Sequence, residues 1–214
     1  MSSSRASSSS VSAVSTFLSY VETSIYVYLH NRKVYAENAF DRRRAFDVVV
    51  YSSRQPELIS YVQDTLNGLR PFIEQGTLKQ ICAVLRDERA SIVERLEIHL
   101  VDFRAGDGSK AFGALVGKDG ARAGLVRLSR LQLPQLSCSN FALVFEIQDQ
   151  NTKEDSDQGQ SDFGDSWIVH DNPVFGASNS NTLQAVRQST VPIVTLADDD
   201  VSQRVVVKIE TTLV

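Results

Sequence analysis

The first candidate for chemistry is the segment GDGSKA at residues 106–111, which follows a predicted strand and opens a predicted helix. Its Gly-x-Gly-x-x-Ala spacing matches loops that turn backbone N–H groups toward a phosphate at a helix N-terminus. A dinucleotide site would also need a parallel sheet and a carboxylate about 20 residues further on, and the sequence predicts neither. We interpret the segment as a turn with a helix cap, and nucleotide binding is the alternative.

The side chains that commonly bind metals or attack substrates are few and scattered. His30, His99 and His170 lie far apart and show none of the short spacings typical of zinc sites. Cys82 and Cys138 lie beside apolar runs, in no recognisable activating context, and we expect them to be reduced. The acidic residues from 149 to 157 lack the glycine that a calcium loop needs at its sixth position. We therefore predict no metal, no cofactor and no enzymatic activity.

Composition and charge limit the partners. The 214 residues carry a formal net charge of −4, with an isoelectric point near 5.4, whereas phosphate binding needs a concentrated basic surface. We therefore expect no direct contact with nucleic acid, and a direct DNA-binding module is the alternative. Arg42, Arg43 and Arg44 could touch phosphate or an acidic partner, although a solvated basic loop is the favoured interpretation. The serine-rich start has no apolar signal region, and no stretch is apolar enough for a membrane span.

Apolar periodicity predicts a chain that alternates helices with short strands. Residues 14–29 show the spacing of an amphipathic helix, and residues 58–73 continue on one helical face after Pro56, with a bend near Pro71. Residues 109–133 predict a third helix despite four glycines. Strands are predicted at 47–51, 78–85, 92–100, 139–147, 191–196 and 204–210, with a hairpin formed by 78–85 and 92–100. The fold class is α+β, with a mainly antiparallel sheet and three helices packed on one side.

A polar tract separates the last part of the chain from the rest. Residues 148–166 read QDQNTKEDSDQGQSDFGDS, and the single tryptophan, Trp167, follows directly. A large apolar side chain beyond a flexible tether is typical of a segment that swings and then docks. We predict a disordered serine-rich tail at residues 1–12, a core at 13–147, a tether at 148–166 and a mobile C-terminal segment at 167–214.

Three parts of the chain resemble the HORMA family. The stretch FLSYVETSIYVYLHNRKVYAENAF (17–40) is similar to the family's opening helix and the loop after it. The stretch QPELISYVQDTLNGLRPFIEQGTLKQICAVL (55–85) is similar in its Pro-Glu-Leu, Tyr-Val-Gln-Asp-Thr-Leu and Pro-hydrophobic-hydrophobic-Glu steps. The stretches SWIVHDN and VPIVTLADDDVSQRVVVKIE are similar to its Trp-Ile segment and closing strands. The resemblance covers about residues 13–212. The chain most resembles the branch of the family that serves translesion DNA polymerase zeta. The stretch LSCSNFALVFEI would fit the spindle-checkpoint branch equally well.

The resemblance implies a HORMA fold whose C-terminal segment, the safety belt, wraps a partner peptide that is added to the core sheet as a strand. It implies a non-catalytic adaptor that clamps a peptide of the catalytic subunit of DNA polymerase zeta in translesion DNA synthesis and DNA damage repair. The expected location is the nucleus, alone or with the cytoplasm. Further implied partners are the scaffold deoxycytidyl transferase, a remodelling AAA+ ATPase and a second copy of the chain. The alternative is a spindle-checkpoint or meiotic HORMA protein that controls cell-cycle progression.

The resemblance also assigns residues to the partner peptide and to self-association. Tyr35, Tyr61 and Trp167 match peptide-binding positions, whereas periodicity alone favours Tyr35 and Tyr61 as ordinary core-edge side chains. Arg122 matches an arginine used for a homodimer or for contact with another HORMA protein, and a solvated helix arginine is the alternative.

The chain departs from the family at a second interface. The polymerase zeta branch presents a Leu, a Gln and a Tyr to the scaffold deoxycytidyl transferase, whereas the matching positions here are Thr190, Arg204 and Val206. We therefore expect this interface to be absent or to recognise a different partner surface. The glycines of the predicted third helix depart from the pattern as well, so the dimerisation face is expected to differ.

Overall fold

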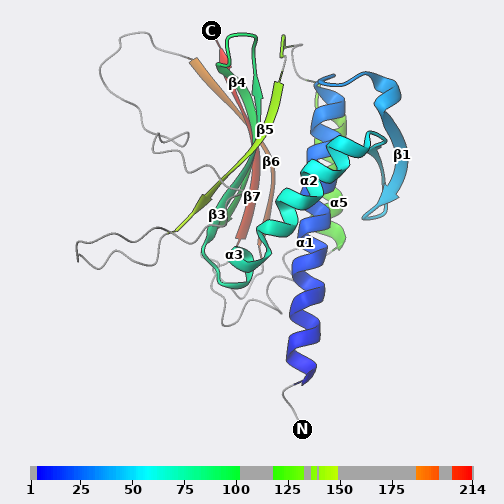
Figure 1. The fold of residues 1–214 in the computed structure, drawn as a ribbon, viewed down its shortest axis with the longest axis vertical. Coiled ribbons are helices and arrows are strands. Elements are labelled where there is room, and N and C mark those ends of the chain that lie inside the picture. Colours follow the sequence, from blue (N-terminus) through cyan, green and yellow to red (C-terminus); the bar gives the residue numbers. More distant parts are fainter. Residues whose placement is uncertain are drawn as a thin grey trace, which may run out of the picture.

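The computed structural model describes residues 4–101, 118–132, 136–138, 140–148, 187–197 and 204–213. Its helices and strands, in chain order, are α1 (Ser4–Asn31), η1 (Glu37–Ala39), β1 (Phe40–Ala45), β2 (Val48–Ser53), α2 (Pro56–Gly68), α3 (Arg70–Glu74), β3 (Leu78–Arg86), β4 (Ile92–Val101), α5 (Lys118–Arg130), β5 (Asn140–Ile147), β6 (Arg187–Ala197) and β7 (Arg204–Leu213). The helices gather on one side of the large sheet (Figure 1). The predicted α+β class is confirmed.

The large sheet has five strands in the order β5-β3-β4-β7-β6, and every pairing is antiparallel. The predicted hairpin of β3 and β4 is present, and β6 and β7 form a second hairpin that joins the sheet at β4. We call the β6–β7 pair the C-terminal hairpin. Among the described residues, β5 and β6 are therefore the two edges of the sheet.

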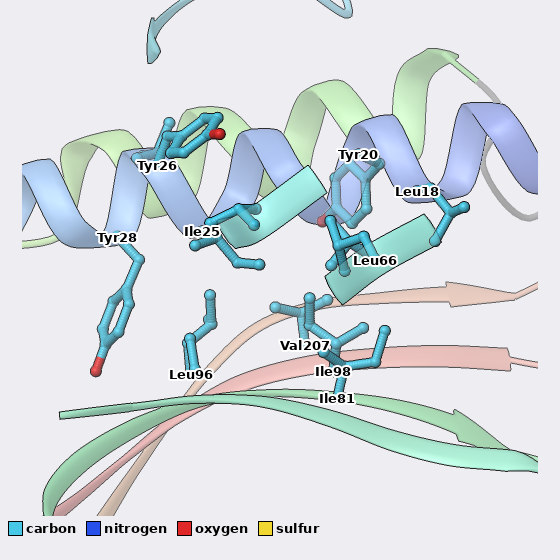
Figure 2. Close-up of a cluster of buried hydrophobic side chains, with 14 of the residues drawn as sticks. Leu18, Tyr20, Ile25, Tyr26, Tyr28, Leu66, Ile81, Leu96, Ile98 and Val207 are labelled. Carbon is cyan, nitrogen blue, oxygen red and sulfur yellow. The ribbon is translucent and has the colours of Figure 1, made fainter. Parts of the chain in front are cut away.

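The core lies between the sheet and the long helix α1. The buried face of α1 carries apolar residues at three- and four-residue spacing, such as Phe17, Val21 and Ile25. In Figure 2, apolar side chains of α1 point toward the inward-facing side chains of the strands, among them Leu96 and Ile98. Alternate residues of a strand point to opposite faces, so the second face of the sheet is left for polar side chains.

The helix predicted over residues 58–73 is broken into α2 and α3. Pro56 occupies the first turn of α2, and Pro71 occupies the first turn of α3. Proline has no N–H to donate, and its fixed φ suits the start of a helix rather than its interior. The bend predicted near Pro71 is therefore present as a helix break at Leu69.

The sequence did not predict β1, which the structure pairs with β2 in a separate two-stranded sheet. Its charged residues hide the alternation typical of a strand, and its tight turn is not built from Asn-Gly. The turn residues Phe46 and Asp47 both have positive φ, 48° and 58°. The ring of Phe46 packs edge-on against Tyr20, with ring centroids 5.8 Å apart, which offsets part of the cost of this backbone conformation.

Other boundaries differ modestly from the predictions. The helix α1 begins at Ser4, inside the serine-rich stretch for which the sequence predicts a tail. The strand β6 begins at Arg187, earlier than predicted, and β7 extends to Leu213. The first part of the predicted third helix and the GDGSKA segment lie outside the described residues. Within the described parts of the chain, every helix is too short or too polar to cross a bilayer.

Candidate functional site

Strand β5 forms one edge of the large sheet among the described residues. It reads NFALVFEI, with Glu146 as its only charge, and it has a neighbouring strand, β3, on one side only among the described residues. Sheet edges in native proteins are usually protected by prolines, lysines or bulges because their unpaired backbone groups attract other strands. Along its own length β5 carries no proline or lysine.

Tyr61 of α2 reaches across to this edge. Its hydroxyl oxygen accepts a hydrogen bond of 2.9 Å from the backbone N–H of Leu143. Its ring packs edge-on against Phe141, at 5.9 Å between ring centroids. Tyr61 nevertheless remains 41% exposed. It therefore forms one wall of the β5 edge and remains available to a molecule that binds there.

The backbone of β5 already uses side chains as substitutes for a neighbouring strand. The N–H of Leu143 donates to Tyr61, and the N–H of Phe141 donates to Oδ1 of Asn140 at 2.6 Å. Residues two apart in a strand point the same way, so both donors lie on the side of β5 away from β3. A guest strand that paired here would replace these two side-chain acceptors with backbone carbonyls.

Tyr35 lies in the segment that follows α1. It is half-buried, and its ring meets Phe40 at 6.4 Å. Burial, and then the negative charge that Tyr61 would carry, raise the pKa of Tyr35. The structure therefore brings Tyr35 and Tyr61 within electrostatic reach of each other, although they are 26 positions apart in the chain.

The opposite edge of the sheet is protected. Strand β6 contains Pro192, which lacks an N–H, and its register with β7 shifts between Pro192 and Val194. A proline and a local irregularity are two of the usual means of blocking strand addition. Helix α5 also packs against β6. Of the two edges, β5 is the one suited to accept a strand.

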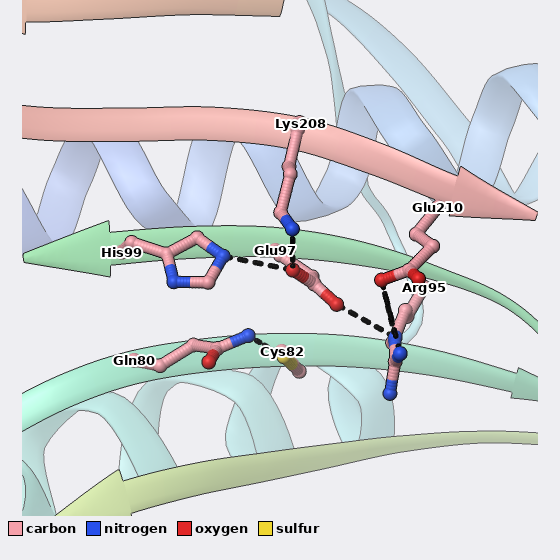
Figure 3. A network of polar contacts seen from close by, with 7 residues as sticks. All are labelled: Gln80, Cys82, Arg95, Glu97, His99, Lys208 and Glu210. Carbon is pink, nitrogen blue, oxygen red and sulfur yellow. Dashed lines mark hydrogen bonds and ion pairs between the residues drawn. The ribbon is translucent and has the colours of Figure 1, made fainter. Parts of the chain in front are cut away.

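A network of charged side chains attaches the C-terminal hairpin to the core on the helix-free face of the sheet (Figure 3). Glu97 of β4 lies 2.9 Å from Lys208 of β7, 2.8 Å from His99 and 2.6 Å from Arg95. Arg95 also contacts Glu210 of β7 at 2.9 Å. Burial alone would raise the pKa of Glu97, but hydrogen bonds, led by that from His99, and the charge of Arg95 lower it to about 2.

A second polar contact lies under the sheet, on the helix side. Arg32, just after α1, forms two hydrogen bonds to the carboxylate of Glu94 on β4, and both side chains are buried. The hydroxyl of Thr211 on β7 donates to the same carboxylate at 2.8 Å. Burial lowers the pKa of Arg32. The end of α1, the core strand β4 and the last strand of the chain thus meet at one carboxylate.

The remaining predicted site residues lie apart from the β5 edge. Arg122 is exposed on α5. Thr190 pairs with Glu210 and Val206 pairs with Thr195 in the C-terminal hairpin. Those two pairs lie four residues apart along β7, or about 13 Å at the usual rise of a strand.

Arg204 is the first residue of β7 and lies two positions before Val206. The structure therefore places Tyr61 at the β5 edge, puts Tyr35 within electrostatic reach of it, and leaves Thr190, Arg204 and Val206 spread along a different part of the sheet. Trp167 lies outside the described residues, as does His170.

The β5 residues that complete the candidate site were not predicted individually. Phe141, Leu143 and Asn140 take part through backbone groups or a short amide, and only the arrangement of the strands shows which groups face outward. The usable sequence signal was the apolar run FALVF, which has no proline or lysine to protect an edge.

The described residues that could take part in redox or metal chemistry are scattered. Among them, no set of three His, Cys, Asp or Glu side chains is placed to hold a metal ion. Cys82 and Cys138 are both free thiols. Burial raises the pKa of Cys82 to about 12, and Gln80 donates a hydrogen bond to its sulfur at 3.0 Å. Burial outweighs this hydrogen bond, which by itself would lower the pKa, and a thiol kept protonated by burial is a poor nucleophile.

Comparison with solved structures gives the class of fold. A chain of the mitotic checkpoint complex superposes with a TM-score of 0.68, covering 94% of this chain and 99% of that one, at 12% identity. Caenorhabditis elegans HTP-2 bound to the HIM-3 closure motif superposes with a TM-score of 0.63, covering 91% of this chain and 87% of that one, at 11% identity. Both are HORMA-domain structures, so the chain has the HORMA fold.

Sequence comparison points to particular relatives within that class. The DNA polymerase zeta processivity subunit of Arabidopsis thaliana is 36% identical over 80 residues, which is 37% of each protein. The mitotic spindle assembly checkpoint protein MAD2B is 33% identical over 76 residues in Gallus gallus and 32% identical in Homo sapiens, over 36% of each protein. The matches thus span little more than a third of these relatives. No model of a known protein family matches the chain.

Proposed function

We propose that this chain is a non-catalytic adaptor that binds an extended peptide of a partner protein as an added strand along β5. The observation that carries the proposal is the asymmetry of the sheet. One edge has Pro192 within its strand, whereas the other has no proline, is mainly apolar and is contacted by the exposed Tyr61. Backbone hydrogen bonds would supply affinity, and the walls at Tyr61 and Tyr35 would select side chains.

The partner we propose is the catalytic subunit of DNA polymerase zeta, in translesion DNA synthesis and DNA repair in the nucleus. Support comes from the name of the plant relative, a polymerase zeta processivity subunit, at 36% identity. In the HORMA structure of HTP-2 the bound partner is a closure motif, which agrees with a short segment as guest. The C-terminal segment, with Trp167, would close over this guest as a safety belt.

A second candidate function is supported by two of the comparisons. The MAD2B relatives carry the name of a spindle assembly checkpoint protein, and the structural match is to a chain of the mitotic checkpoint complex. A checkpoint role would use the same edge with a different guest. Affinity purification of the tagged chain from dividing cells and from DNA-damaged cells would separate the two functions. Recovery of the polymerase catalytic subunit would support the first, and recovery of checkpoint proteins would support the second.

The binding test uses peptides from the disordered part of the polymerase catalytic subunit and isothermal titration calorimetry. We expect Tyr61→Ala to weaken binding by 10-fold or more, about 1.4 kcal/mol, because an aromatic side chain at a binding site is often a major contributor. Gln63→Ala is the matched control. Gln63 is exposed on the same helix as Tyr61, but it donates a hydrogen bond to Glu22 of α1 and not to β5. Trp167→Ala tests the belt separately.

A second pair of variants tests the edge itself. Val144 of β5 lies between Leu143 and Phe145, so its side chain points to the helix-free face, and Val144→Lys would place a charge on the edge without removing a core side chain. Thr195→Lys puts the same charge on the exposed face of β6. We expect only Val144→Lys to reduce peptide binding. Equal binding by both variants and the unmodified chain would contradict strand addition at β5.

A further inference from the structure

The arginines of β1 belong to a basic surface that the peptide-binding proposal does not use. Arg42, Arg43 and Arg44 are all exposed on this strand. The strand paired with it, β2, packs against α5 as well as against α1. Arg122 and two further arginines are exposed on α5. Figure 1 shows the positions of β1 and α5. We call the hairpin of β1 and β2, together with the exposed side of α5, the hairpin–α5 surface.

The exposed side of α5 is rich in arginine. Its buried side consists of Ala121, Gly124, Leu125 and Leu128, while its exposed arginines are Arg122, Arg127 and Arg130. At 1.5 Å per residue, these arginines span about 12 Å of helix. The only described acidic side chain of α5 is Asp119.

Few of these arginines are neutralised by acidic neighbours. Arg44 contacts Asp47 at 3.6 Å and Arg54 contacts Asp41 at 3.4 Å, and all four side chains are about half exposed or more. Exposed ion pairs of this kind are weak and exchange readily with other partners. Among the described residues, Arg43 and the arginines of α5 have no acidic partner within 4 Å.

The net charge of −4 conceals this surface because most of the acidic residues lie in other parts of the sequence, with Asp41, Asp47 and Asp119 as the exceptions. The densest acidic runs are at 149–165 and 198–200, outside both the hairpin and α5. The expectation that the chain makes no contact with nucleic acid was based on its overall charge. Binding of a polyanion depends instead on the local field of a basic surface.

The composition of the surface favours phosphate over another protein. The fully buried centre of a protein–protein interface is usually apolar or aromatic. Val49 is the only large apolar side chain among the described residues of this surface that is strongly exposed, at 63%. Interfaces with nucleic acid are polar and strongly positive. The guanidinium group is also suited to bidentate contact with phosphate.

Tyr51, on strand β2, is not free to stack on a base. The ring of Tyr51 stacks on His30 with centroids 3.4 Å apart, and the guanidinium of Arg42 lies over the same ring at 5.9 Å. These contacts hold Arg42 in place instead of offering an open platform for bases.

We propose that the hairpin–α5 surface binds the phosphate backbone of duplex DNA without reading its sequence.

The test uses the full-length chain and a fluorescein-labelled duplex of mixed sequence, about 20 base pairs long, with fluorescence anisotropy at several salt concentrations. If about four phosphates are contacted, affinity should fall roughly 100-fold between 50 and 200 mM salt. Arg43→Glu and Arg127→Glu should each weaken binding by about 10-fold and make the salt dependence shallower by roughly one contact. Arg122 is left unchanged because it is also the residue predicted for HORMA–HORMA contacts.

The control is Arg89→Glu, which makes the same change of charge on the exposed turn between β3 and β4. It should leave affinity within about twofold, and thermal melts of all variants check folding. The proposal is wrong if the chain does not bind DNA at 50 mM salt, or if Arg89→Glu is as damaging as Arg43→Glu. It is also wrong if Arg127→Glu alters self-association in light scattering while DNA affinity stays constant. None of these outcomes bears on the β5 edge, because the two surfaces share no residue.

Discussion

Replacing Gly124 with alanine tests how closely the C-terminal hairpin is seated on the helices. Gly124 is buried in the middle of α5, and a Cβ atom there would lie 2.7 Å from the hydroxyl of Tyr20 and 2.8 Å from Cγ1 of Val194 on β6. Neither approach is compatible with normal van der Waals contact. Val194 is half-buried and can yield, but Tyr20 is 1% exposed and packs against Phe46.

Two effects of opposite sign set the size of the change. Alanine is better than glycine inside a helix by about 1 kcal/mol. Overpacking a well-filled site typically costs about 1–3 kcal/mol. Because the nearest obstacle is a buried tyrosine, we expect the packing cost to win, and Gly124→Ala to reduce the free energy of unfolding by about 1 kcal/mol. For a chain of this size that lowers Tm by roughly 2–4 °C.

Urea unfolding and thermal melts measure the change. Ala123→Gly, at the neighbouring exposed position, reports the helix-propensity term alone and should cost about 1 kcal/mol. Adding Tyr20→Phe removes the obstructing oxygen, so Gly124→Ala should be less damaging in that background than in the unmodified chain. If Gly124→Ala stabilises the protein by the full propensity gain, α5 and β6 do not meet as the structure shows.

Three further predictions concern the polar contacts. Arg32→Met should lower the free energy of unfolding in urea by about 3–5 kcal/mol, because it leaves the buried Glu94 carboxylate without its partner. Adding Glu94→Met should recover most of this loss. A loss below about 1 kcal/mol would contradict the buried pair. Folding lowers the pKa of Glu97 from 4.5 to about 2, so its contribution to stability is complete above about pH 4.5 and is lost as the pH falls toward 2. Glu97→Gln should therefore flatten the dependence of Tm on pH across this window, and an unchanged profile would show that the network is not formed. Tyr61→Phe should speed hydrogen exchange of the Leu143 amide, which loses its acceptor, with no such change expected at Ala83 in the middle of the sheet.

The sequence was sufficient for most of the regular elements. The apolar spacing of α1 and the alternation of apolar with charged or polar residues in β4 are strong signals, and both elements were predicted. The strand β1 was missed because three arginines occupy positions where a strand usually shows alternation. Their side chains can be exposed on both faces of a small two-stranded sheet, so no apolar period remains to be detected.

The candidate site was predictable only in part. Tyr61 and Tyr35 were assigned from the resemblance to the HORMA family, since their spacing alone indicated ordinary core positions. The outward-facing backbone groups of β5 depend on which strands pair with it, and that arrangement joins residues more than 50 positions apart in the chain. Periodicity within one strand carries no such information. The glycine at position 124 likewise has a physical reason that only the packing of Tyr20 and Val194 reveals.

Amide hydrogen exchange of β5, measured by NMR with and without the partner peptide, tests the central claim most directly. Strand addition predicts that the peptide strongly slows exchange at outward-facing amides such as Leu143, while amides on the opposite edge, such as Thr195 of β6, keep their rates. Unchanged exchange along residues 141–147 in the presence of saturating peptide, or protection confined to β6, would contradict the account.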